Sequence, residues 1–457
     1  MKPLKISEVA KAVGGTINNP DIADKLIVGV SFDTREAMDD MIFVPLKGEN
    51  TDGHNFLHEA MKCGAVCVFS EVETYIDAIM VEDAAQALKD LAEYYRSLFD
   101  VKVVGITGSN GKTSTKDMIA SVLAEKYNVV KTIGNFNNEI GLPTTIFNID
   151  ENTDVIVLEM GMNHSGEISR LSKIARPDYA VITNIGVAHI ENLGSQEGIF
   201  KAKSEILDYL APNGKVYLCG DDNFLTRYRD RRSYIFYGYG MRNSYRATDI
   251  DGGGLDSSMY TVTLKNGETL EAYLPTPGRH MVLNSLAAIA IGEEFGLTAA
   301  QIAEGIKKFK SSGRRMNVIE TNGGMRVIDD CYNASPDSMK AALEVLIQAQ
   351  DGNTIAILGD MLELGESSYD MHFDVGAEAA KLCIDTIICV GEASEATYEG
   401  AYNAFRDGGS NSQIIYFGSK DDCMAQLDAF VKPGDTILVK ASRGMRFEDI
   451  VSKLVND

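Results

Sequence analysis

The sequence lacks the features of a membrane-spanning, secreted or nucleic-acid-binding protein. No uncharged apolar run reaches the roughly 18 residues that a membrane helix needs. The chain does not open with a basic segment, an apolar core and a small-residue cleavage site. Lysine and arginine total 43 against 66 acidic residues, a net charge of −23, and no basic patch interrupts this excess. We therefore expect a cytoplasmic protein with neither a membrane nor a nucleic-acid partner.

Paired cysteines are also missing. The seven cysteines are an odd number, and the close pair Cys63 and Cys67 has no second pair of metal ligands to match it. This spacing does not favour a zinc site, and free thiols in a reducing compartment are expected. What remains is an ordinary globular composition, 45% hydrophobic and 24% charged over 457 residues, which suffices for roughly two to four domains.

Residues 101–116, VKVVGITGSNGKTSTK, predict a phosphate-binding loop. An apolar strand (101–106) precedes the glycines, and an amphipathic helix (113–126) follows them. Backbone N–H groups at such a helix start bind phosphate, while Lys112 reaches a terminal phosphate and Thr113 can hold Mg²⁺. The loop is shorter than the usual pattern, because Ile106 stands where its first glycine would be. The predicted nucleoside triphosphate site consists of Gly108, Ser109, Asn110, Gly111, Lys112, Thr113 and Ser114.

The chain divides into three blocks, 1–99, 100–313 and 314–457. The first mixes short strands with helices and ends in an amphipathic helix from residue 84 to about 99. In the second, strands at 101–106, 155–158, 179–183 and 216–218 alternate with helices at 113–126, 196–210 and 280–295. A second alternation begins after the serine and glycine residues at 311–313. Such alternation predicts an α/β protein with a mostly parallel central sheet and a smaller nucleotide-fold-like C-terminal domain.

Polar residues that follow these strands are the candidates for chemistry, because ligands of open α/β sheets bind beyond the carboxyl ends of the strands. Glu159 directly follows strand 155–158 and suits Mg²⁺, although a helix-capping or solvated role is the alternative. His189 follows the strand at 179–183, and a metal or phosphate role stands beside an ordinary core or surface position. The amide-rich segment Gly134–Pro143 reads as a substrate loop or as a turn.

Two segments near the amino end combine hydroxyl groups, cationic side chains and glycines. They are SFDTR at 31–35 and KGENTDGHNF at 47–56. They could bind a second phosphorylated ligand, and a plain surface loop is the alternative.

Several motifs, in matching order along the whole chain, resemble the Mur ligase family of ATP-dependent amide ligases, which build the peptide stem of bacterial cell wall. The short GSNGKT loop is similar to that family's variant phosphate loop. The other segments are GNFNNEIGLP from Gly134, EMGMNHSGEI from Glu159, NIGVAH from Asn184, DDCYNASPDS from Asp329, GDMLELGE from Gly359 and SRGMRFE from Ser442.

The resemblance implies a reaction and a domain plan. A substrate carboxylate takes the γ-phosphate of ATP, and an amine then attacks the acyl phosphate, so that ADP and phosphate leave. The EMG and GDMLELGE segments favour UDP-N-acetylmuramoyl-tripeptide and D-alanyl-D-alanine as substrates. The family plan makes 1–99 a UDP-substrate-binding domain, 100–313 the ATP-binding domain and 314–457 a Rossmann-like domain, and we expect a monomer. Addition of the third stem residue, folylpolyglutamate synthesis and a non-catalytic nucleotide-binding module are the alternatives.

The resemblance also assigns residues. Two Mg²⁺ ions would be held by Thr113, Glu159, His189 and a carbamylated lysine, for which Lys203 fits the motif better than Lys201. The catalytic set would be Lys112, Glu159, His189, Lys203 and Arg314. The nucleotide would further contact Asn284, Arg314, Asp330, Tyr332 and Asn333. The other substrates would contact Ser31, Thr34, Arg35, Lys47, Asn137, Asn138 and Arg443.

Overall fold

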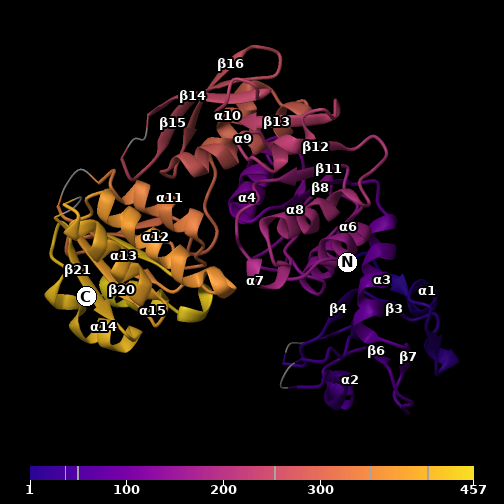
Figure 1. The fold of residues 1–457 in the computed structure, drawn as a ribbon. Helices are drawn as coiled ribbons and strands as arrows, with labels where there is room; N and C mark the ends of the chain where they lie inside the picture. Colours follow the sequence, from indigo (N-terminus) through magenta and orange to yellow (C-terminus); the bar gives the residue numbers. More distant parts are fainter. Residues whose placement is uncertain (36–37, 49–50, 252–253, 350–351, 409–410, 457) are drawn as a thin grey trace.

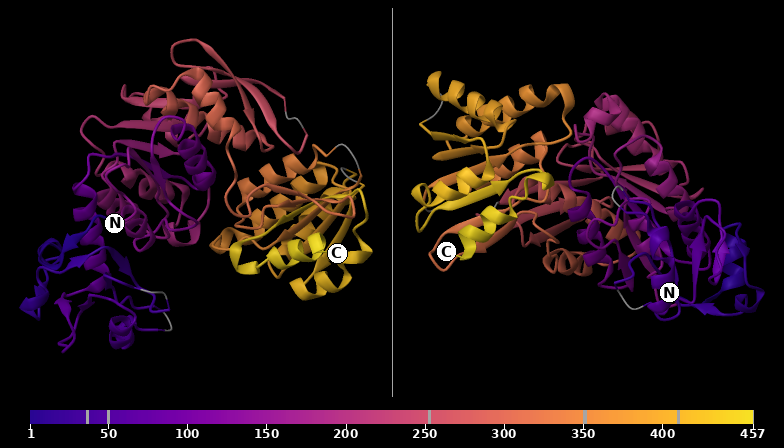
Figure 2. Two further views of the ribbon diagram at one scale, coloured as in Figure 1. Left: turned by 180° about the vertical axis from the view of Figure 1, so that it is seen from behind. Right: turned by 90° about the horizontal axis from the view of Figure 1, so that it is seen from below.

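The computed structural model describes residues 1–35, 38–48, 51–251, 254–349, 352–408 and 411–456. The chain forms three consecutive α/β parts, with the C-terminal part (orange to yellow) and the N-terminal part (indigo) both lying against the central part (Figure 1). Two further views confirm that the N- and C-terminal parts lie at opposite ends of the molecule (Figure 2). The predicted α/β fold is confirmed, and each sheet takes its strands from within one predicted block, while the exact boundaries stay predictions.

The N-terminal part is a small five-stranded sheet of order β2-β7-β6-β5-β4 with a separate β1-β3 pair. Its elements are β1 (Leu4–Lys5), α1 (Ile6–Ala12), β2 (Thr16–Ile17), β3 (Leu26–Ile27), β4 (Gly29–Ser31), β5 (Met41–Phe43), α2 (Leu57–Lys62), β6 (Cys67–Ser70), β7 (Ala78–Met80) and α3 (Ala84–Ser97). Helix α3 also packs on the central part, because the buried Tyr95 hydroxyl donates to Ile149 O at 2.7 Å and its ring meets Phe147 edge-on. These two parts therefore share one core.

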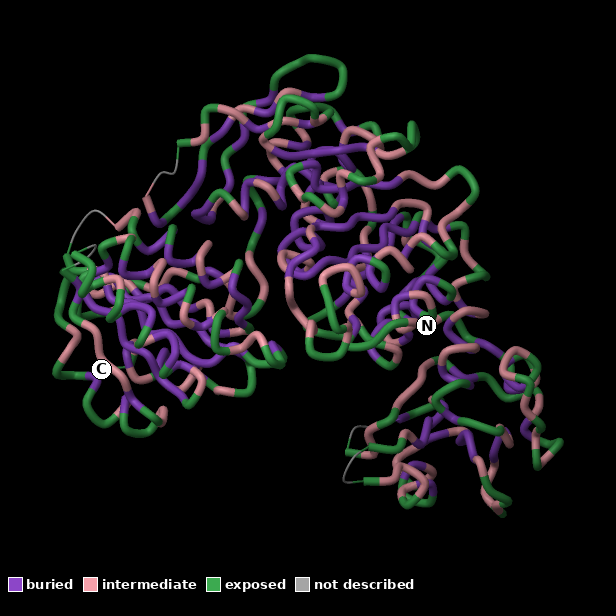
Figure 3. The backbone as a smooth tube through the Cα atoms, in the orientation of Figure 1, coloured by how far each residue is buried: buried purple, intermediate pink, exposed green. Residues whose placement is uncertain are grey.

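The central part is a nine-stranded sheet of order β16-β15-β14-β13-β12-β11-β8-β10-β9. It contains β8 (Lys102–Thr107), α4 (Lys112–Leu123), β9 (Val129–Lys131), α5 (Gly141–Ile146), β10 (Val155–Glu159), α6 (Glu167–Ala175), β11 (Tyr179–Ile182), α7 (Ile190–Leu193), α8 (Gln196–Ser204), β12 (Lys215–Cys219), β13 (Tyr234–Gly238), β14 (Tyr245–Asp251), β15 (Ser258–Thr263), β16 (Thr269–Leu274), α9 (Arg279–Glu294) and α10 (Ala299–Lys307). Strands β8 to β14 are parallel, while β15 and β16 pair antiparallel at one edge. The inner strands β8, β10, β11, β12 and β13 are buried on both faces, as helix-covered strands must be (Figure 3).

The C-terminal part is a six-stranded sheet of order β17-β18-β22-β19-β20-β21, parallel except for β17. It contains β17 (Asn317–Glu320), β18 (Arg326–Asp329), α11 (Pro336–Leu346), β19 (Thr354–Gly359), α12 (Ser368–Lys381), β20 (Thr386–Val390), α13 (Ser394–Arg406), β21 (Gln413–Phe417), α14 (Lys420–Gln426), β22 (Thr436–Lys440) and α15 (Glu448–Asn456). Among the described residues, no helix is long and apolar enough to cross a membrane.

The order of the central strands explains where the site forms. Strand β8 lies between β10 and β11, and the three run parallel. Their carboxyl ends therefore meet at one edge of the sheet, where Glu159 pairs in register with Ile106 and Ile182 with Thr107. The phosphate loop, Glu159 and the segment leading to His189 thus emerge side by side.

Candidate active site

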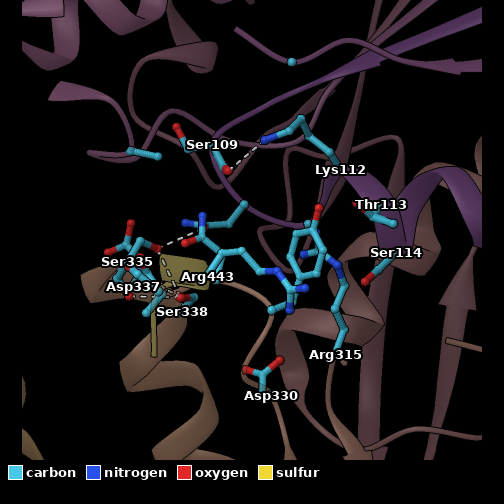
Figure 4. A pocket seen from close by; sticks show the side chains of 18 of the residues that line it. Ser109, Lys112, Thr113, Ser114, Arg315, Asp330, Ser335, Asp337, Ser338 and Arg443 are labelled. Atoms are coloured by element: carbon cyan, nitrogen blue, oxygen red, sulfur yellow. Dashed lines mark hydrogen bonds between the residues drawn. The ribbon is translucent and has the colours of Figure 1, made fainter. Parts of the chain in front are cut away.

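A cavity of about 550 Å³ lies between the central and C-terminal parts. The central part contributes the phosphate loop, Glu159, His189 and the first turns of α9, and the C-terminal part contributes residues 330–338, 362–364 and 440–444. Figure 4 shows Lys112, Thr113 and Ser114 on one wall, with Asp330, Arg315 and Arg443 facing them. One cavity therefore collects the ends of strands from two separate sheets.

The phosphate loop takes the shape that its glycines permit. Gly111 has a φ of +78°, and an added Cβ would lie 2.5 Å from Asn284 Oδ1, so only glycine fits the turn before α4. The Lys112 ammonium donates to the loop carbonyls of Gly108 at 2.8 Å and Ser109 at 3.1 Å. Burial lowers the pKa of Lys112, and the nearby Glu159 carboxylate partly opposes that shift. A cation thus stands at the start of α4, where a terminal phosphate would bind.

Glu159 has the environment of a metal ligand. Its side chain is only 2% exposed, and its Oε1 accepts a hydrogen bond from Asn137 Nδ2 at 2.8 Å. Its Oε2 is buried and has no hydrogen-bond partner. A buried carboxylate oxygen without a donor is costly, and a hard cation in the cavity would satisfy it. Within the described residues no three His, Cys, Asp or Glu side chains form a metal cluster, so a full ligand set would need other oxygen donors as well.

Lys203 is buried behind the phosphate loop. Its side chain is 1% exposed, and Nζ donates to Gly108 O at 2.9 Å, the same carbonyl that accepts from Lys112. Burial, reinforced by the like charge of Lys112, lowers the pKa of Lys203 well below its usual value. Both effects favour the uncharged, nucleophilic form of the amine. By contrast, Lys201 on the same helix is exposed.

The C-terminal wall contains an ion pair between Asp330, which was predicted as a site residue, and Lys440, which was not. Lys440, at the end of β22, lies 2.5 Å from Asp330 Oδ2 and donates to Asn333 O at 3.1 Å. This lysine therefore fixes the loop that carries Asp330, Tyr332 and Asn333, all of which line the cavity. The position of a cation at the carboxyl end of a strand was the signal that could have identified Lys440.

The two arginines after the interdomain break point in different directions. Arg314, the predicted phosphate contact, lies 3.1 Å from Asp329 and does not line the cavity. Arg315 lines the cavity and stacks on the Tyr332 ring at 4.0 Å. The role of Arg314 stays a prediction, and of the two arginines only Arg315 lines the cavity.

His189 touches the C-terminal part directly. Its Nδ1 lies 2.6 Å from Glu363 Oε2, although the ring N–H is not aligned for a straight hydrogen bond. The contact with His189 lowers the pKa of Glu363. The phosphate loop makes a second bridge, in which Ser335 Oγ donates to Asn110 Oδ1 at 2.9 Å. Glu363 belongs to the GDMLELGE segment and was not among the predicted site residues.

Most predicted residues of the ATP and metal sets meet at this cavity. Its lining includes Ser109, Asn110, Gly111, Lys112, Thr113, Ser114, Asn137, Glu159, His189, Asn284, Asp330, Tyr332, Asn333 and Arg443. Gly108 and Lys203 stand directly behind the loop. Asn138 instead caps its own turn, because its Oδ1 accepts from the Ile140 and Gly141 N–H groups.

The predicted substrate residues of the N-terminal part lie outside the cavity. The Asp33 carboxylate pairs with Arg35, and the Asp33 backbone forms hydrogen bonds with the Ser31 hydroxyl. Lys47 lies 2.5 Å from Glu71. The Thr34 carbonyl accepts a hydrogen bond from Cys63 Sγ. Residues 49–50 of the segment at 47–56 lie outside the described residues. Ser31, Thr34, Arg35 and Lys47 therefore stay predicted contacts for a part of the substrate far from the phosphate loop.

Comparison with known proteins identifies relatives over the full chain. Residues 106–292 match the family model described as the Mur ligase middle domain, and residues 314–443 match the Mur ligase, glutamate ligase domain. The chain is 39% identical to the UDP-N-acetylmuramoyl-tripeptide–D-alanyl-D-alanine ligase of Bacillus subtilis, over 98% of each chain. It resembles the crystal structure of MurF from Acinetobacter baumannii (TM-score 0.92, 31% identity, 100% of both chains). It also resembles MurF ligase from Thermotoga maritima in complex with ADP (TM-score 0.82, 29% identity, 93% and 97% of the chains).

Proposed function

Because the chain belongs to the Mur ligase family, we propose that it joins D-alanyl-D-alanine to UDP-N-acetylmuramoyl-tripeptide with the consumption of ATP. The observation that carries the proposal is the single cavity in which Lys112, Glu159 and Arg443 converge. The full-length relatives supply the substrates, since the cavity alone would serve other amide ligations.

The chain's own residues account for a stepwise reaction. The terminal carboxylate of the tripeptide attacks the γ-phosphorus of ATP, the bond to the β,γ-bridging oxygen breaks, and ADP leaves. The amine of D-alanyl-D-alanine then attacks the acyl carbon, loses a proton, and expels inorganic phosphate. Lys112 and the N–H groups at the start of α4 are placed to neutralise the transferred phosphoryl group. Arg443 lines the same cavity, and we assign its guanidinium to a substrate carboxylate; in the structure it lies 3.2 Å from Glu448.

We include Mg²⁺ in the proposal. Glu159, whose buried Oε2 has no hydrogen-bond partner, lines the cavity together with Thr113 and His189. Carboxylate and hydroxyl oxygens are the hard donors that suit Mg²⁺, and the family resemblance adds the His189 ring. When bound, Mg²⁺ supplies charge neutralisation for the phosphates.

We also propose that Lys203 is carbamylated. Its uncharged amine would attack carbon dioxide, form an N–C bond and release one proton to solvent, which leaves an anionic carbamate on the lysine. The lowered pKa of Lys203 supports this step, because only the unprotonated amine reacts. A carbamate would also remove a buried positive charge from beside Lys112 and add a hard oxygen for Mg²⁺.

We further propose that the enzyme acts as a monomer in the cytoplasm, without nucleic-acid or membrane partners. The phosphate loop, Glu159, His189 and the C-terminal residues that face them complete the described cavity within one copy of the chain. The net charge of −23 opposes binding to nucleic acid, and the cytoplasm holds the ATP that the reaction consumes.

A panel of amines tests the substrate assignment. Purified protein is given ATP, Mg²⁺ and UDP-N-acetylmuramoyl-tripeptide with D-alanyl-D-alanine, D-alanine or glutamate, and products are identified by mass. We expect an adduct and phosphate release with D-alanyl-D-alanine alone. Turnover with glutamate, or with a UDP-N-acetylmuramoyl-dipeptide as acceptor, would instead assign a different ligation.

A further inference from the structure

Glu363 is the residue of the C-terminal part that reaches His189, and no role is assigned to it above. The closest approach is 2.6 Å, from His189 Nδ1 to Glu363 Oε2. A backbone contact accompanies it, in which Glu191 N–H donates to Glu363 O at 3.4 Å. Both His189 and Glu363 line the cavity.

The two residues are held in place by strained and anchored backbones. His189 has a φ of +65° and Glu363 a φ of +64°, a left-handed conformation that costs energy for residues other than glycine. The loop of Glu363 is fixed on its N-terminal side, because Met361 N–H donates to His372 Nε2 and Leu362 N–H donates to Ser442 Oγ, both at 2.9 Å. Such local strain at a cavity is typical of side chains that must be aimed.

The contact distinguishes the two ring nitrogens of His189, because it is made by Nδ1. Glu363 takes the Nδ1 side of the imidazole, which leaves Nε2 for a ligand. Histidines that bind metals commonly donate their other N–H to a carboxylate, which orients the ring and raises its basicity. Here the carboxylate comes from a different domain than the histidine.

We propose that Glu363 is a positioning residue for His189, and that it aims Nε2 at the metal site only when the C-terminal part lies against the central part. The inference rests on the proposed Mg²⁺ role of His189. It makes the metal site depend on domain placement, because neither part holds both members of the pair. When the C-terminal part is displaced from the central part, the metal ion would bind more weakly, and catalysis would be slowed for that reason.

The test is Mn²⁺ binding to the full-length protein saturated with a non-hydrolysable ATP analogue, measured by electron paramagnetic resonance. The variants are Glu363→Ala, Glu363→Gln and His189→Ala, with Glu366→Gln as the matched control. Glu366 is an exposed glutamate in the same segment that does not line the cavity. We expect about 10- to 100-fold weaker Mn²⁺ binding at one site in Glu363→Ala, a smaller loss in Glu363→Gln, and no change in Glu366→Gln.

Steady-state kinetics provide the second readout. The KM for Mg²⁺ should rise in Glu363→Ala by the factor found for Mn²⁺, while kcat at saturating Mg²⁺ stays near the parent value. Unchanged or tighter Mn²⁺ binding in Glu363→Ala overturns the proposal, and so does unchanged binding in His189→Ala. If Mn²⁺ binding weakens as expected but the parent protein ligates no D-alanyl-D-alanine, the positioning role stands and the proposed function fails.

Discussion

Removal of the Lys203 amine should abolish ligation without unfolding the protein. The side chain is 1% exposed and its Nζ binds the phosphate-loop carbonyl of Gly108, so a carbamate there would lie beside the phosphate-binding loop. Loss of one preorganised electrostatic group costs about 10²- to 10³-fold in kcat, or about 2.7–4 kcal/mol. We therefore expect Lys203→Met, which retains the buried stem, to melt near the parent temperature and to keep at most about one hundredth of kcat.

Truncation of the same side chain separates packing from chemistry. Lys203→Ala should lose the same activity and, in addition, about 2–5 kcal/mol of unfolding free energy, because it leaves a cavity where the stem was. Formate or acetate should partly restore its activity by placing a carboxylate in the space left by the stem. With ¹³C-labelled bicarbonate, a carbamate signal should appear in the parent protein and be absent from both variants.

The neighbouring lysine is the control. Lys201 is exposed and lies about 200° around the helix axis from Lys203, so Lys201→Ala should keep most activity. The reasoning is refuted if Lys203→Met keeps more than about a tenth of the parent rate, or if Lys201→Ala is the inactive variant.

Three further substitutions, and a control at Gly296, probe the loop and the C-terminal part. Lys112→Ala should keep less than about a tenth of the rate, a loss of at least ~1.4 kcal/mol, with an unchanged melting curve; a higher rate rejects its phosphate role. Gly111→Ala should lose about 1–2 kcal/mol of unfolding free energy and raise the KM for ATP, because the added methyl group displaces Asn284. Gly296 also has a positive φ, +69°, and Gly296→Ala should lose only stability. Burial lowers the pKa of His372 in the folded protein. The unfolded chain therefore binds more protons than the folded one below about pH 6.5, and the free energy of unfolding should fall between pH 7.5 and pH 5.5. His372→Gln should flatten this pH dependence.

The parallel core and the phosphate loop were predictable because local signals determine them. Strands such as β8 and β10 are apolar on both faces, and the glycines at 108 and 111 stand where the backbone needs unusual φ values. Strands β15 and β16 were not assigned, although buried and exposed residues alternate along them. The sequence analysis looked for continuous apolar runs, and a sheet edge with one solvated face carries none.

The candidate site was predictable where one sheet builds it. Glu159 is the last residue of β10, and the sheet order places it beside Ile106, at the base of the phosphate loop, without further information. Contacts across domains were not predictable, since no local sequence pattern encodes how two sheets face each other. Glu363 was missed for that reason, and the choice between Arg314 and Arg315 depended on a one-residue difference in side-chain direction. Lys440 pairs with Asp330 within the C-terminal part, and its place at the end of a strand was a signal that went unused.

Oxygen transfer from the acceptor carboxylate to phosphate tests the central claim most directly. UDP-N-acetylmuramoyl-tripeptide labelled with ¹⁸O in its terminal carboxylate is turned over with ATP and D-alanyl-D-alanine, and the released phosphate is analysed by mass. Attack of that carboxylate on the γ-phosphate predicts one ¹⁸O atom in each phosphate and ADP as the nucleotide product. Unlabelled phosphate, or ¹⁸O in AMP, would contradict the account.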